Sequence, residues 1–354
     1  MDNQQEAQEV KKLFKTNRVF IPILIGLSFA AYVLYKDFDP KAFALIDWNL
    51  KMLFWLLMAV FCMLLRDIGY IIRIRILSEG KISWRNSIDV ILLWEYASAI
   101  TPSVVGGTGA AFFIVNKEGI NLGKTSSIVL ITALMDEIFF VSMVPILFAI
   151  VGTSGLFPQE LSVPLFGVQI GVKFVFWLSY TIIVAYVLLI AYGIIFNPQG
   201  LKRLIFKLTN LPLLRRLKRK ALKTTQEIEE AAKDLHGHSW SFWTKALVGT
   251  FLSWTARYMS LNCIIMAFAV GAGIEVDNFL VYARQLVMWI IMLISPTPGG
   301  EGIAQFAFEV FLKEYTPEGL NGLLAILWRF VTYYPYLIIG AFILPAWIRR
   351  VFAK

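Results

Sequence analysis

Long apolar segments separated by shorter polar segments dominate the pattern along the chain. Six of them are long enough, or nearly so, to cross a hydrocarbon core of about 30 Å as a helix. They cover residues 19–35, 52–72, 128–151, 172–196, 247–270 and 323–348. No small-residue cleavage site follows the first segment, so we expect it to be retained. The pattern predicts an all-α integral membrane protein with about six full spans.

Two further apolar segments, 88–115 and 281–312, are interrupted by proline and glycine. The first contains ITPSVVGGTG at 100–109, and the second contains ISPTPGGEG at 294–302. Proline has no backbone N–H to donate, and glycine adopts backbone conformations that are closed to other residues. Such backbone is tolerated within a membrane only where it is buried in protein or lines a wet cavity. Each segment is therefore predicted to be a helical hairpin, with half-helices at 88–100 and 109–115 and at 281–294 and 302–312.

The distribution of Lys and Arg predicts the orientation of the chain. With both termini in the cytoplasm, 23 of these cations fall in cytoplasmic segments and four in segments on the opposite side. Cytoplasmic loops carry an excess of Lys and Arg. This assignment requires both hairpins to enter and leave the membrane on one side. The sequence thus favours two re-entrant hairpins over two further full spans.

The surroundings of the two hairpins are similar. Trp94 and Trp289 lie shortly before the two breaks, and Asp136 and Arg329 follow the breaks at the same spacing. We therefore expect an inverted-topology repeat, with a substrate site near the membrane midplane. Repeat one covers 52–151, and repeat two covers about 245–348 within a C-terminal segment 242–354. The other divisions are 1–51 with the first span, a connecting span at 152–196 and a basic cytoplasmic linker at 197–241.

Composition agrees with a membrane protein and excludes several classes of function. Hydrophobic residues make up 58% of the chain and charged residues 16%, with a mean hydropathy of +0.68 and a net charge of +9. Cys62 and Cys263 lie in apolar spans, where buried thiols are ordinary. There is no Walker A loop, nucleophile elbow or zinc spacing, and His236 and His238 lack further ligands. We expect no metal, no cofactor, no nucleic-acid partner and no pumping driven by ATP.

The linker 197–241 is rich in both leucine and basic residues between 213 and 223. This combination is typical of a helix that lies on the anionic inner leaflet of a membrane. A solvated helix that only helps to set the topology explains the composition equally well. Both interpretations remain open at this stage.

Ionisable side chains within apolar segments are energetically costly and often functional. The candidates are Arg66, Asp67, Glu95, Asp136, Glu137, Arg257, Arg284, Glu301 and Arg329. One interpretation is that cations of repeat two and carboxylates of repeat one neutralise each other in structural pairs. The other is that they line a polar cleft for a charged lipid headgroup, because the guanidinium fork suits phosphate.

The glycines of the two breaks are candidates for contacts with an anionic ligand. They are Gly106, Gly107 and Gly109 in the first break and Gly299, Gly300 and Gly302 in the second. A half-helix that begins at Gly109 or Gly302 would present unpaired N–H groups and the positive end of its dipole. The simpler explanation is a tight turn that lets helices approach. Glu301 has a competing role as a cap of the second half-helix.

Several motifs together resemble the flippase-like family, which is the transmembrane region of lysylphosphatidylglycerol synthases and their stand-alone relatives. These motifs are residues 294–302, 327–335, and the break at 101–109 with Asp136 and Glu137. The resemblance covers roughly residues 15–350. It implies a bacterial inner-membrane protein that moves a lipid between leaflets, without the soluble aminoacyl-transfer domain. Relatives often place a charged residue just after the first break, where this chain has 110–112 AAF, so the lipid stays open.

The leading hypothesis is therefore a membrane lipid translocase, uncoupled or ion-coupled, for a phospholipid or a polyprenyl-linked lipid. Its partners would be lipids with anionic headgroups. One alternative is an integral-membrane transferase acting on a lipid acceptor, with Glu95 and Asp136 as its carboxylates. Another is a scaffold that recruits envelope enzymes through the basic linker.

Overall fold

The computed structural model describes residues 40–44, 46–101, 104–157, 162–165, 168–195, 197–210, 229, 233, 237–292 and 303–352. The predicted span 19–35, the basic stretch 213–223 and the second break with Gly299, Gly300, Glu301 and Gly302 lie outside the described residues.

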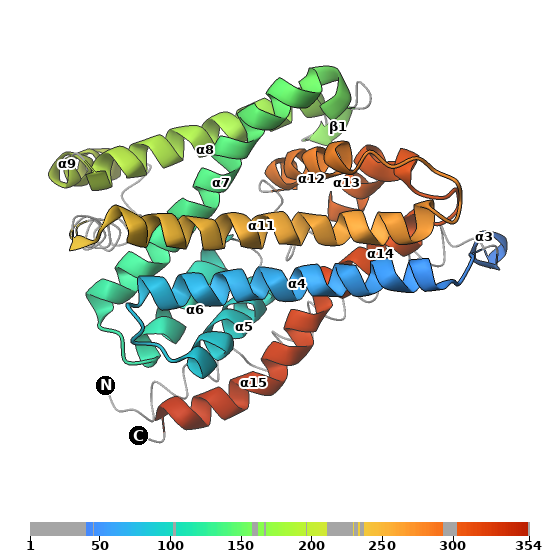
Figure 1. Ribbon diagram of the computed structural model, residues 1–354. Helices are drawn as coiled ribbons and strands as arrows, with labels where there is room; N and C mark the ends of the chain where they lie inside the picture. Colours follow the sequence, from blue (N-terminus) through green and yellow to red (C-terminus); the bar gives the residue numbers. More distant parts are fainter. Residues whose placement is uncertain are drawn as a thin grey trace.

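The described chain is almost entirely helical, as predicted (Figure 1). The α-helices are α3 (Pro40–Ala44), α4 (Leu50–Leu77), α5 (Trp84–Ile100), α6 (Val104–Lys117), α7 (Leu122–Leu156), α8 (Val172–Ile195), α9 (Pro198–Thr209), α11 (Trp240–Ala269), α12 (Asn278–Met292), α13 (Ile303–Leu312), α14 (Asn321–Thr332) and α15 (Tyr334–Phe352), with a 3₁₀ turn at Lys313–Tyr315. One departure from all-α is a short antiparallel hairpin between α7 and α8. Its strands are β1 (Ser162–Leu165) and β2 (Val168–Gly171), with Ser162 opposite Gly171.

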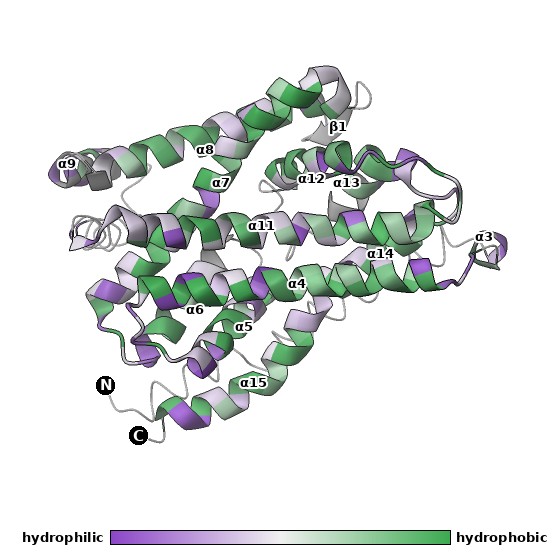
Figure 2. Ribbon diagram, in the orientation of Figure 1, coloured by the Kyte–Doolittle hydropathy of each residue, from purple (hydrophilic) through white to green (hydrophobic). Residues whose placement is uncertain are grey.

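Four segments of the described chain are long and apolar enough to cross a membrane. They are Leu50–Leu77, Leu122–Leu156, Val172–Gly193 and Asn321–Phe352. Helix α11 is 30 residues long but less apolar, because it carries buried polar side chains such as Thr250, Ser253 and Asn262. Apolar colouring covers most of the helices in Figure 2. The structure supports a multi-pass membrane protein, and the count of six full spans stays a prediction.

Helices α4 and α11 lie side by side and antiparallel at the centre of the molecule (Figure 1). They approach closely at Gly69 and Gly249, since a Cβ added to Gly69 would stand 2.8 Å from the Gly249 carbonyl oxygen. Ser253 Oγ donates a hydrogen bond of 2.8 Å to the Arg66 carbonyl, and Ser260 Oγ donates one of 3.0 Å to the Ala59 carbonyl. Small residues and such hydrogen bonds are typical of tight helix pairs in membranes.

A pair of short helices follows each of these two long helices. Helices α5 and α6 pack against each other after α4, and α12 and α13 do the same after α11. Because α4 and α11 are antiparallel, the two pairs lie at opposite ends of the central pair (Figure 1). This arrangement is compatible with an inverted repeat. Re-entry into the membrane and the repeat itself stay predictions.

The start of α6 differs from the prediction. The helix begins at Val104 rather than at Gly109. The first four N–H groups of a helix lack intrahelical partners. Gly106 and Gly107 fall in this first turn, whereas Gly109 lies inside the helix, so its N–H is not one of the unpaired donors. The prediction overestimated how strongly glycine interrupts a helix, because all three glycines of the first break lie within α6.

The predicted span 323–348 is divided at Tyr333 into α14 and α15. Pro335 explains the division, because it cannot donate the hydrogen bond that a continuous helix would require. Tyr333 Oη donates a 2.8 Å hydrogen bond to the Ala99 carbonyl near the end of α5. Farther along, a Cβ on Gly340 would stand 2.3 Å from Tyr96 Cβ. Helix α15 therefore packs directly on α5.

The C-terminal end of α15 is tied to the α5–α6 pair by an ion-pair network. Arg350 contacts Glu118 at 2.6 Å and Asp89 at 3.0 Å, and Trp347 Nε1 donates to Glu118 at 2.8 Å. The Glu118 side chain is 3% exposed, so these partners are needed to compensate its burial.

Candidate functional site

Arg66 lies in the middle of α4 and forms ion pairs inside the helix bundle. Its side chain is 1% exposed, and its guanidinium contacts Asp67 at 2.7 Å and Glu95 of α5 at 2.6 Å. A guanidinium at this depth requires carboxylate partners, because an unpaired buried charge is strongly destabilising. Tyr70 and Tyr336 stack over the same guanidinium at 4.6 and 4.9 Å.

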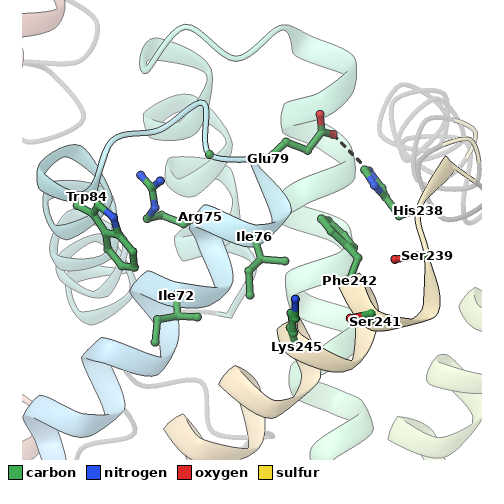
Figure 3. Close-up of a pocket in the computed structure, with 11 residues that line it drawn as sticks. Ile72, Arg75, Ile76, Glu79, Trp84, His238, Ser239, Ser241, Phe242 and Lys245 are labelled. Atoms are coloured by element: carbon green, nitrogen blue, oxygen red, sulfur yellow. Dashed lines mark ion pairs between the residues drawn. The ribbon is translucent and has the colours of Figure 1, made fainter.

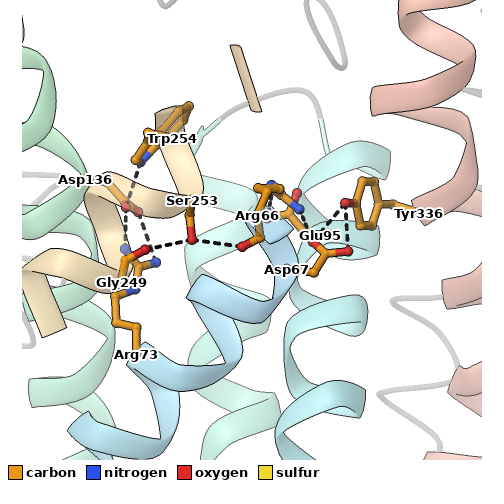
Figure 4. Close-up of polar contacts among 9 residues, drawn as sticks. All are labelled: Arg66, Asp67, Arg73, Glu95, Asp136, Gly249, Ser253, Trp254 and Tyr336. Atoms are coloured by element: carbon orange, nitrogen blue, oxygen red, sulfur yellow. Dashed lines mark hydrogen bonds and ion pairs between the residues drawn. The ribbon is translucent and has the colours of Figure 1, made fainter. Parts of the chain in front are cut away.

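Tyr336 brings α15 into this arrangement (Figure 4). Its hydroxyl donates to both carboxylate oxygens of Asp67, at 2.9 and 3.0 Å. Asp67 is therefore held between Arg66 and Tyr336.

A second ion pair lies two helical turns farther along α4. Arg73 contacts Asp136 of α7 at 2.5 Å and Thr250 of α11 at 3.0 Å. Trp254 Nε1 on α11 donates a 2.9 Å hydrogen bond to the same carboxylate (Figure 4). Asp136 thus joins three helices through one side chain.

We name Arg66, Asp67, Arg73, Glu95 and Asp136 the inner charged cluster. Tyr70 connects its two halves, because its ring lies 4.6 Å from the Arg66 guanidinium and 4.5 Å from that of Arg73. The two arginine side chains are 1% and 6% exposed, whereas the carboxylates are 18%, 23% and 24% exposed. The cluster therefore presents its carboxylates outward and keeps its cations covered.

Arg257 approaches the inner charged cluster from α11. Its guanidinium lies over the rings of Trp254 and Trp289, at 5.5 and 5.3 Å, and Trp254 itself donates a hydrogen bond to Asp136 of the cluster. Among the described residues we find no ion pair within 4.0 Å and no hydrogen bond for this half-buried side chain. Arg257 gives the site three cations beside three carboxylates, and in the described part of the chain its own guanidinium is held by aromatic rings.

Two polar groups beside the cluster also lack partners in the described part of the chain. They are Glu137 Oε2 and Tyr258 Oη, both of which are buried. Buried polar atoms in folded proteins are nearly always hydrogen-bonded, to protein or to an ordered ligand or water. Glu137 and Tyr258 are therefore two polar positions that a bound headgroup or water can satisfy.

Arg284, expected to contact the ligand, has an extensive set of protein partners. It contacts Glu314 at 2.6 Å and donates 3.0 Å hydrogen bonds to the carbonyls of Gly155 and Phe311. These carbonyls belong to the last turns of α7 and α13, which lack intrahelical partners. Arg284 therefore fastens helix ends together.

Arg329 lies in α14 and is 8% exposed. Its guanidinium stacks over the Tyr333 ring at 4.1 Å, and Tyr333 in turn contacts the end of α5. Through Tyr333, Arg329 is therefore linked to the end of α5.

The glycines of the first break have different surroundings. A Cβ on Gly107 would stand 2.3 Å from Ser98 Oγ and 3.1 Å from Ser98 Cα, so Gly107 allows close packing of α6 on α5. A Cβ on Gly109 would meet nothing within 4 Å. Gly106 lies in the first turn of α6. The tight-packing explanation thus holds for Gly107.

One of the two interpretations of these charged residues was ion pairing between the two repeats, but the ion pairs of this site join residues of the same repeat. Arg66 pairs with Glu95, Arg73 with Asp136, and Arg284 with Glu314. The halves meet instead through uncharged donors, Trp254 to Asp136 and Tyr336 to Asp67. Arg73 was not among the predicted site residues, although its spacing of seven residues from Arg66 places both on one helix face.

The fold and the site define a class of protein: a helical, multi-pass membrane protein with an ion-paired cluster inside its helix bundle. The chain belongs to the family described as "Lysylphosphatidylglycerol synthase TM region", which matches residues 19–340. It is also 24% identical over 299 residues to a "UPF0104 membrane protein" of Archaeoglobus fulgidus, with 82% of each chain covered. No solved structure gives a significant match.

Proposed function

We propose that this protein moves a phospholipid or a polyprenyl-linked lipid between the two leaflets of its membrane, with the headgroup passing the inner charged cluster. Family membership supports a role connected with membrane lipids. A polar headgroup loses its hydration when it enters a hydrocarbon core, and fixed charges inside a helix bundle offset that cost.

The observation that carries this proposal is the position of Arg257. A guanidinium stacked on Trp254 and Trp289, without an ion-pair partner in the described chain, is ready to bind phosphate through its planar fork. Arg66 and Arg73 are already neutralised by carboxylates of the protein. The phosphate of the lipid is therefore assigned to Arg257.

The carboxylates have a complementary role in this proposal. Glu95 is 23% exposed and belongs to the cluster that Arg257 approaches, so a cationic group attached to the phosphate can contact it. Glu137 supplies a further acceptor through its unpartnered oxygen. The site would then recognise a headgroup by the arrangement of its negative and positive groups. The low polarity of the helix bundle strengthens each of these contacts.

The test is leaflet exchange of labelled lipids in proteoliposomes that contain the full chain. Arg257→Gln should lower the exchange rate by about tenfold, as expected when a hydrogen bond to a charged group is lost. Arg85→Gln removes the same charge from an exposed position on α5 and is the matched control. An exchange rate for Arg257→Gln equal to that of Arg85→Gln would show that Arg257 does not bind the lipid.

Lipid analysis of a deletion strain separates transport from synthesis. A transporter changes the exposure of a lipid on the two leaflets and leaves the set of lipid species intact. Disappearance of a lipid species on deletion, restored by the wild-type chain, would instead favour a transferase.

A further inference from the structure

A cavity of about 540 Å³ lies where α4 ends and α11 begins (Figure 3). Pockets that bind small molecules in proteins commonly measure about 300–1,000 Å³. Because α4 is one of the candidate spans and the cavity lies at its end, we expect the cavity at the level of a membrane surface.

This cavity is separate from the inner charged cluster, although both use α4. Arg73 belongs to the cluster and is buried, whereas Arg75 lines the cavity. Arg73 and Arg75 are two positions apart, and residues at that spacing lie about 200° apart around the axis of an α-helix. The two arginines therefore point to nearly opposite faces of α4. A ligand in the cavity therefore contacts a different set of charges from a headgroup at the cluster.

Cations from two helices line the cavity. Arg75 stacks on Trp84 at 4.4 Å and donates a 2.6 Å hydrogen bond to the Ile82 carbonyl, which holds its guanidinium in place. Lys245 is an exposed side chain on the opposite helix, α11. Arg75 and Lys245 thus provide one fixed charge and one movable charge for an anion.

The first turn of α11 adds polar groups to the same wall. Ser239 precedes the helix, and its hydroxyl makes no capping hydrogen bond, while Ser241 lies in the first turn. The first N–H groups of a helix and the positive end of its dipole favour an anion. These groups reinforce the cations from Arg75 and Lys245.

Glu79 is the one carboxylate among the residues that line the cavity, and its charge is compensated. Lys124 contacts it at 2.6 Å, His238 at 3.3 Å and Lys81 at 3.7 Å. The hydrogen bond from Lys124 holds the pKa of Glu79 below its ordinary value of 4.5. Glu79 is therefore ionised but neutralised by its neighbours, and the lining keeps an excess of positive charge.

The rest of the lining is apolar. Ile72, Ile76, Trp84 and Phe242 form it, so hydrocarbon can pack beside the cations. A free inorganic anion would leave this apolar surface exposed to water, whereas a lipid would cover it.

We propose that this cavity is a second lipid site, which binds the phosphate of an anionic phospholipid between Arg75 and Lys245 and packs the start of its acyl chains against Ile72 and Ile76. The site does not depend on the translocation proposed above, because none of its residues belongs to the inner charged cluster.

The experiment uses the full chain in nanodiscs with a photoactivatable lipid whose reactive group lies near the headgroup. Phosphatidylglycerol should label peptides from the end of α4 and the start of α11 more strongly than phosphatidylcholine does. In the double variant Arg75→Gln, Lys245→Gln, the labelling by phosphatidylglycerol should fall about fivefold for each cation removed. Equal labelling by the two lipids would overturn the proposal.

Two further arms keep the test decisive. Lys245→Gln alone changes an exposed side chain and serves if the double variant does not fold, and Lys51→Gln at the other end of α4 is the matched control. Lys245→Gln should lower labelling while Lys51→Gln leaves it unchanged, and the reverse result contradicts the site. Millimolar glycerol phosphate that is present during irradiation should not reduce the labelling by the lipid. Complete loss of labelling would mean that the site takes the free anion.

Discussion

Arg73 of α4 and Asp136 of α7 form a 2.5 Å ion pair inside the helix bundle, and this pair organises the centre of the protein. Trp254 of α11 donates to the same carboxylate, so three helices depend on one side chain. In a low-polarity interior such a pair stabilises the fold mainly because either partner alone would be costly to bury.

We therefore predict that Asp136→Asn destabilises the protein strongly. The change keeps the shape of the side chain but leaves Arg73, which is 6% exposed, without its counter-charge. The loss in free energy of unfolding should be about 3 kcal/mol, measured by thermal unfolding in detergent.

The double variant Arg73→Gln, Asp136→Asn should recover part of this loss, because no buried charge remains unpaired. Asp47→Asn changes an exposed carboxylate and should shift stability by less than about 0.5 kcal/mol. If Asp136→Asn is as stable as Asp47→Asn, the ion pair has no structural role.

Arg284 and Arg257 should respond differently to the same substitution. Arg284→Gln removes an ion pair to Glu314 and weakens the hydrogen bonds that hold the ends of α7 and α13. We expect a loss of about 2 kcal/mol in stability, with unchanged leaflet exchange per folded molecule. Arg257→Gln should show the opposite pattern.

Thermal unfolding and proteoliposome exchange on the same preparations would check this contrast. Slower exchange by stable Arg284→Gln protein would mean that Arg284 contacts the lipid after all.

Gly340 and Gly109 provide a matched pair of glycine substitutions. A Cβ at Gly340 would stand 2.3 Å from Tyr96 Cβ, which cannot move without the α5 backbone, whereas Gly109 has open space around it. Gly340→Ala should destabilise the protein by about 1–3 kcal/mol through overpacking. Gly109→Ala should be neutral or stabilising by up to about 1 kcal/mol, because alanine is the better helix former.

Thermal unfolding of the two variants decides between close packing and mere helix propensity. Equal effects at Gly340 and Gly109 would contradict the close packing of α15 on α5.

Glu79 should contribute a small, pH-dependent stabilisation. Because Lys124 lowers its pKa in the folded protein, the contribution is present above pH 4.5 and is lost as the pH falls through the lowered pKa. The side chain is 37% exposed, so the effect should stay below about 1 kcal/mol.

Melting temperatures of the wild type and Glu79→Gln between pH 7 and pH 3 would measure it. The difference between them should shrink toward the acid end, and the exposed Glu318→Gln should show no such trend. A constant difference across this range would exclude the Lys124 contact as its source.

Reasoning from the sequence located the helices and many of the charged positions. The predicted segment 172–196 corresponds to α8, and 302–312 corresponds to α13 within one residue. Apolar length is a local property of the chain, so the sequence reveals it directly. The choice of partners is not local. Arg284 meets Glu314 and Arg73 meets Asp136 because helix packing and rotation bring these side chains together.

The sequence by itself determined that this is a helical membrane protein, since its long apolar segments have no other stable form in lipid. It also pointed to buried charge as the feature to explain. Only the tertiary structure decided that Arg284 fastens helix ends, that Gly107 serves close packing, and that Arg257 stacks on two tryptophans. The reason is physical: the cost of a buried charge follows from its residue type, but its compensation depends on which groups the fold places within a few ångströms.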